Sequence, residues 1–121
     1  MRYIEISFPT SLDNIKDTKN DNIDVFIKLE DGNSYTVTVS TPQNYYSFME
    51  KEHINFIPAM PPDIIVKELT ETNIRDAIQT YCEEDAFWLK LYYLLGIRND
   101  VFDIQKMNNV IQEMNERLNE L

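Results

Sequence analysis

Residues 23–40 read IDVFIKLEDGNSYTVTVS. Apolar and polar side chains alternate on both sides of Asp31-Gly32-Asn33, as they do in strands that bury one face. Gly32 tolerates the positive φ that a tight hairpin turn requires, so an Asp-Gly pair between two alternating runs is a strong hairpin signal. The sequence therefore predicts two antiparallel strands joined by a short turn.

Two more strands are expected outside this hairpin. Residues 3–8 alternate between apolar and polar side chains in the same way. Residues 63–69 contain Ile64, Ile65 and Val66, and branched residues in a short run favour a strand. Together with the hairpin, these segments predict a small antiparallel sheet of about four strands in the N-terminal half.

Helices are predicted after the hairpin and after residue 70. Thr41 can cap a helix, and Pro42 suits the first helical position because its missing N–H would have had no partner there. This first helix should end near Glu52. Thr70 is the expected cap of the next helix, where Leu69 and Ile74 have the spacing of a hydrophobic staple.

The following segment, residues 83–95, allows two interpretations. Its apolar residues fit a helical period and a strand period in part. It begins with three carboxylates, which suit the positive end of a helix dipole, and Gly96 can close a helix. Length and these end signals favour a helix.

The C-terminal segment carries an apolar heptad stripe, for which Asn99 or Asp100 is the expected helix cap. The stripe alternates steps of three and four residues and consists of Ile104, Met107, Ile111, Met114 and Leu118, with Leu121 in phase. It can pack onto the sheet, or it can pair with a second copy in a homodimer. Val101 and Val110 widen the stripe, which favours packing within the chain.

These elements predict one α+β domain over residues 1–121. Three C-terminal helices should pack the sheet, and the last of them is amphipathic with the heptad stripe. A chain of 121 residues, 43% of them hydrophobic, is within the usual size of a single domain and can hold a core without disulfides.

Charge narrows the classes of partner. The net charge is −10, and the sequence has no run of basic residues, which argues against nucleic acid and against anionic membranes as partners. A basic protein is favoured, because opposite fields speed encounter. Cys82 is the single cysteine and no secretory signal opens the chain, so we expect a soluble protein of the reducing cytoplasm.

The sequence predicts no catalytic residue, cofactor or metal site. Cys82 and His53 form the only Cys/His pair, and acidic neighbours would raise the pKa of the Cys82 thiol rather than activate it. The acidic loop fails the calcium-loop pattern, since Lys19 and Asn22 fall at ligand and glycine positions counted from Asp17. No glycine-rich phosphate loop is present.

The favoured hypothesis is a non-catalytic acidic binding protein. Its most specific form is an immunity protein or inhibitor that neutralises a basic toxin such as a nuclease. Tyr and Trp are common at binding hot spots, and carboxylates can surround them. The predicted partner-binding surface consists of Asp63, Glu71, Asp76, Glu83, Glu84, Asp85, Trp88 and Tyr92.

Two alternatives remain open. The chain can be a structural or adaptor protein that homo-oligomerises through its C-terminal helix, with the heptad stripe as the contact. A hydrolase is the less favoured alternative, and it would have to use carboxylates, with Glu5 or Glu84 as the base.

Overall fold

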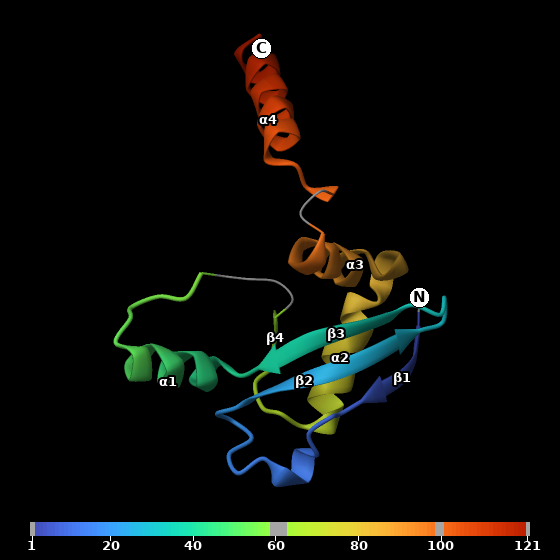
Figure 1. The fold of residues 1–121 in the computed structure, drawn as a ribbon, viewed down its shortest axis with the longest axis vertical. Coiled ribbons are helices and arrows are strands. Elements are labelled where there is room, and N and C mark those ends of the chain that lie inside the picture. The colour runs from blue at the N-terminus through green and yellow to red at the C-terminus, as the bar shows by residue number, and fades with distance from the viewer. Residues whose placement is uncertain (1, 59–62, 99–100, 121) are drawn as a thin grey trace.

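The computed structural model describes residues 2–58, 63–98 and 101–120 and shows an α+β fold (Figure 1). One four-stranded sheet has the order β1-β2-β3-β4, and the last three helices follow it in the chain. The strands are β1 (Tyr3–Ser7), β2 (Asn22–Leu29), β3 (Ser34–Ser40) and β4 (Asp63–Ile65). The helices are the 3-10 turn η1 (Leu12–Asn14), α1 (Pro42–Glu52), α2 (Glu71–Tyr81), α3 (Glu83–Ile97) and α4 (Ile104–Asn119).

The predicted hairpin is confirmed as β2 and β3. The two strands pair antiparallel, with Val25 opposite Val37 and Ile27 opposite Tyr35. Gly32 has φ +87° in the turn, the left-handed region that a residue without Cβ enters at little cost. Alternate residues of β2 are buried and exposed along its whole length, so one face of the hairpin belongs to the core.

The sheet is mixed, whereas the sequence predicted antiparallel pairing throughout. β1 pairs antiparallel with β2, but β4 runs parallel to β3, with Val39 opposite Ile64. A parallel neighbour needs a crossover connection, and the segment between β3 and β4, which includes α1, supplies it. The Asp-Gly turn motif makes the β2–β3 hairpin predictable from a short stretch of sequence. No short stretch of sequence indicates the direction of β4 relative to β3.

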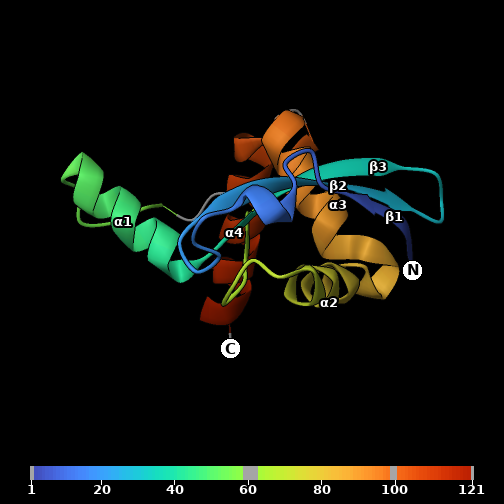
Figure 2. The same ribbon diagram turned by 90° about the horizontal axis from the view of Figure 1, so that it is seen from below.

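The core lies between one face of the sheet and α2 (Figure 2). Ile74 and Ile78 of α2 are fully buried against it, and Leu69 before the helix is buried as the staple predicted. The predicted cap is also confirmed, because the Thr70 hydroxyl accepts a hydrogen bond from the Asn73 N–H at 3.1 Å. From α3, Leu89 completes the same core.

Helix α1 begins as predicted and contributes no buried residue. The Thr41 hydroxyl accepts from the Asn44 N–H at 3.3 Å, and Pro42 is the first helical residue. The helix ends at Glu52, as predicted, and His53 after it has φ 56° and is exposed. Figure 1 shows α1 extending to one side of the sheet.

Helix α4 stands apart from the sheet, and none of its described residues is buried (Figure 1). The preference for packing within the chain is therefore wrong. The physical reason is that α2 and α3 already cover the apolar face of the sheet, where Val25, Leu29 and Val39 have no exposed surface left. The cap is Asp103, whose carboxylate accepts from the Lys106 N–H at 3.0 Å; the predicted caps Asn99 and Asp100 lie outside the described residues.

Candidate functional site

The junction of α2 and α3 places three carboxylates on the surface. Cys82, the last residue before the junction, is fully buried, while Glu83, Glu84 and Asp85 are exposed. Glu84, Asp85 and Ala86 have φ between 53° and 59°, so the chain makes a left-handed turn before α3 continues. We call Glu83, Glu84 and Asp85 the acidic corner. Burial raises the pKa of the Cys82 thiol and so disfavours its thiolate form.

An aromatic row begins beside the acidic corner. The Trp88 ring centroid lies 6.1 Å from that of Tyr92, and Tyr92 lies 5.8 Å from Tyr81 of α2. The Trp88 side chain is 49% exposed. The Phe87 ring contacts it edge-on, with the two ring centroids 5.5 Å apart. A shallow hollow of about 270 Å³ is lined by Thr80, Tyr81, Trp88 and Tyr92. Five of the eight predicted residues, namely the acidic corner, Trp88 and Tyr92, thus lie on the first part of α3.

The other predicted members lie elsewhere. Asp63 is on β4, where its carboxylate accepts hydrogen bonds from the Ser40 hydroxyl, at 3.1 Å, and from the Tyr45 hydroxyl. Glu71 is at the far end of α2, ~15 Å from the junction at 1.5 Å per residue, and pairs with Arg75 at 2.9 Å. Asp76 is exposed halfway along α2. The predicted surface is therefore not one continuous patch.

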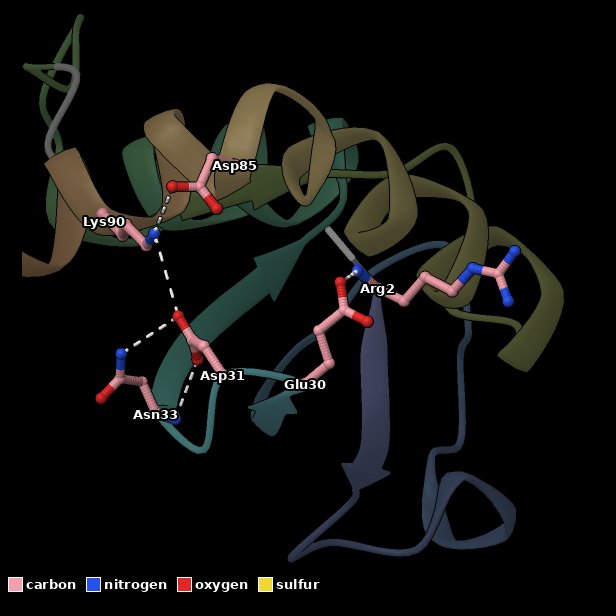
Figure 3. A network of polar contacts seen from close by, with 6 residues as sticks. All are labelled: Arg2, Glu30, Asp31, Asn33, Asp85 and Lys90. Atoms are coloured by element: carbon pink, nitrogen blue, oxygen red, sulfur yellow. Dashed lines mark hydrogen bonds and ion pairs between the residues drawn. The ribbon is translucent and has the colours of Figure 1, made fainter.

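Lys90 connects the acidic corner to the hairpin turn (Figure 3). Its ammonium lies 3.3 Å from Asp85 Oδ2 and 3.9 Å from Asp31 Oδ2. Asp31 in turn accepts from the backbone N–H of Asn33 at 3.0 Å, which holds the turn in shape. One cation thus bridges two carboxylates from distant segments, and it neutralises part of the corner's charge.

A second, larger hollow lies where α3 passes strands β2 and β3. It measures about 650 Å³ and is lined by Phe26, Ser34, Tyr35, Thr36, Tyr92, Tyr93, Gly96 and Ile97. The rings of Tyr93 and Tyr35 contact each other edge-on, with their centroids 5.0 Å apart, and this contact holds α3 beside β3. Sequence reasoning missed Phe26, although a phenylalanine among the polar outward positions Asp24 and Lys28 was a readable signal.

The third surface feature is the apolar stripe of α4. Its side chains are between 44% and 69% exposed, and they are Ile104, Met107, Ile111, Met114 and Leu118. Val110, 54% exposed, widens the stripe. Leu121 lies outside the described residues. The stripe is the most extended run of exposed apolar side chains on any one element that the structure describes.

Over residues 2–58, 63–98 and 101–120, no three His, Cys, Asp or Glu side chains are grouped so that they could hold a metal ion. No described helix is long and apolar enough to cross a membrane.

No family model, curated protein or solved structure matches the chain. The physical chemistry of the three surface features above is therefore the basis for any statement about function.

Proposed function

We propose that this protein is a non-catalytic binding protein that associates with a second copy of itself through α4. The observation that carries the proposal is the exposed apolar stripe on a helix with no buried residue. Burying one such side chain contributes ~1.5–3 kcal/mol, so leaving five of them in water is unfavourable unless a partner covers them.

The size of the stripe supports a helical partner of the same kind. If each of the five side chains and Val110 buries on the order of 100 Å², two copies together bury roughly 1,200 Å², which exceeds the ~1,000 Å² of a specific interface. The heptad spacing is the one that lets two helices interlock side chains along a seam.

The charges on α4 argue against lipid as the alternative partner. Helices that lie on membranes carry Lys and Arg over their polar face. The acidic side chains Glu113 and Glu116 of α4, and Glu120 at its end, outnumber the basic side chains Lys106 and Arg117. An anionic lipid surface would repel this helix.

The test compares Ile111→Glu with Gln112→Glu. Both substitutions add one negative charge to α4, but only the first lies in the stripe. We expect wild type and Gln112→Glu to associate as concentration rises, and Ile111→Glu to remain monomeric. Light scattering over a concentration series measures this, and circular dichroism checks that helix content is retained.

Two results would overturn the proposal. The first is a wild-type chain that stays monomeric up to millimolar concentration. The second is an Ile111→Glu chain that associates as well as Gln112→Glu does. A chain that lacks residues 105–121 should be a folded monomer, because α4 contributes nothing to the core; loss of its fold would show that the helix belongs to the body.

A second candidate function uses the acidic corner. Exposed Trp88 beside Glu83 and Glu84 resembles a binding hot spot with a charged rim, which suits a basic protein. An immunity protein or inhibitor of a basic toxin, such as a nuclease, is the specific form of this proposal. Charge would hold such a complex, so raising the salt concentration should release the partner.

A further inference from the structure

We propose that the two copies pair through α4 in antiparallel orientation, with Met107 of each copy opposite Ile111 of the other; this inference rests on the proposed self-association. The orientation follows from three observations: the residues that flank the stripe, the place of α4 relative to the body, and the net charge of the chain.

The flanking residues favour the antiparallel register. Asp103, Val110 and Arg117 lie seven residues apart, so they share one edge of the stripe. In an antiparallel pair this edge faces the same edge of the second copy. Placing Met107 opposite Ile111 sets the two Val110 side chains against each other. It also sets Asp103 of each copy beside Arg117 of the other, with opposite charges.

A parallel pair lacks this complementarity. The edge that carries Asp103, Val110 and Arg117 would then face the opposite edge of the second helix, which carries Asn108 and Asn115. Neither asparagine has a charge to match Asp103, and Val110 would lie against an amide. The apolar seam would still form, so the flanking residues decide between the two orientations.

The body of the protein adds a second argument. It lies at the N-terminal end of α4, and the C-terminus lies at the far end (Figure 1). A parallel pair would bring two bodies of a chain with net charge −10 together at one end. An antiparallel pair separates them along a helix of 16 residues, ~24 Å, which exceeds the Debye length of ~8 Å at physiological salt.

Disulfide trapping tests the orientation. Two chains are prepared, Met107→Cys with an affinity tag and Ile111→Cys without one, and mixed with oxidised glutathione as the oxidant. We expect the mixed, singly tagged disulfide dimer to be the main product on a non-reducing gel. Wild type is one control, because its single Cys82 is buried. Asn109→Cys is the other, because residue 109 lies on the outer side of α4.

The outcomes separate this inference from the proposed self-association. Disulfides within each variant alone, with none between the variants, mean a parallel pair, which overturns the inference and leaves self-association standing. A dimer in solution that forms neither product has another register and also overturns the inference. A wild-type monomer at every concentration overturns both proposals.

Charge reversal gives an independent measurement that leaves the stripe intact. Arg117→Glu would place a carboxylate beside Asp103 of the second copy and should raise the dimer dissociation constant roughly two- to thirty-fold. Asp103→Asn keeps a capping side chain and removes the charge, so adding it to Arg117→Glu should restore part of the affinity. No restoration would mean that the two residues do not meet.

Discussion

Tyr45 and Asp63 form a long-range contact between side chains outside the core. The Tyr45 hydroxyl of α1 donates to the Asp63 carboxylate of β4. Burial, together with this hydrogen bond, raises the pKa of Tyr45 from 10 to about 12. Asp63 therefore holds α1 against the start of β4. Its carboxylate serves this contact and is not part of the acidic corner.

This contact predicts a stability change at high pH. Because the folded pKa of Tyr45 is raised, the folded state favours the protonated phenol, and that stability is complete below pH 10 and lost as pH rises to about 12. Urea unfolding at several pH values should show wild type losing more stability over this window than Tyr45→Phe. Tyr35 and Tyr81 titrate in both chains, so only the difference between the chains is informative. Equal losses would contradict the prediction.

Sequence reasoning at the scale of residues succeeds where the cause is local. The sequence predicts Thr41 and Thr70 as caps correctly, because the backbone N–H that each cap accepts from is only three residues away. The sequence places Asp63 on the predicted binding surface, because nothing near it in sequence indicates that Tyr45 is its partner. The link from Lys90 to Asp31 was missed for the same reason.

At the scale of elements, the turn between α2 and α3 is the most strained part of the described backbone. Three consecutive residues have positive φ although none of them is glycine: Glu84, Asp85 and Ala86. The left-handed region costs a residue with Cβ roughly 1–2 kcal/mol, and core residues Cys82 and Leu89 on either side hold the turn in place.

Glycine at position 84 should therefore stabilise the protein. Glu84→Gly removes the strain at an exposed site, so the free energy of unfolding should rise by about 0.5–1 kcal/mol. Asp76→Gly is the matched control: it removes one exposed carboxylate too, but from an ordinary helical position in α2, and should cost about 0.3 kcal/mol, the difference between the helix propensities of Asp and Gly. Urea denaturation measures both. A Glu84→Gly chain that is as destabilised as Asp76→Gly would show that no left-handed turn is present.

The elements themselves were largely predictable, and their relations were not. The hairpin, the caps of α1 and α2 and the heptad of α4 follow from patterns within one segment. Gly96 was expected to close α3, yet the helix continues to Ile97, since nothing in the structure requires a positive φ at Gly96. The parallel direction of β4 and the exposure of α4 depend on which surfaces other segments have already covered.

At the scale of the whole molecule, the net charge of −10 acts in opposite directions on the two proposed associations. Two copies repel each other, so screening by salt should favour self-association through the apolar stripe. A basic partner is attracted, so the same screening should weaken its binding at the acidic corner.

We therefore expect opposite salt dependences. Between ~50 and ~500 mM salt, the dimer dissociation constant should fall or stay level, while binding of poly-lysine should weaken. The double variant Glu83→Lys, Glu84→Lys should bind poly-lysine less than Asp13→Lys, Asp17→Lys, which has the same net charge and leaves the corner intact. Light scattering and fluorescence titration measure the two effects. Equal binding by the two variants would mean that the corner has no special role.

The position of α4 also bears on the order of events during synthesis. Every buried core residue that the structure describes lies between Ile6 and Leu89, and about 30 residues of the given sequence, including α4, follow Leu89. A ribosome needs a few seconds to add that many residues. The apolar stripe is therefore synthesised after all of the described core residues, so a nascent chain carries no α4 surface for another chain to bind until the core sequence is complete.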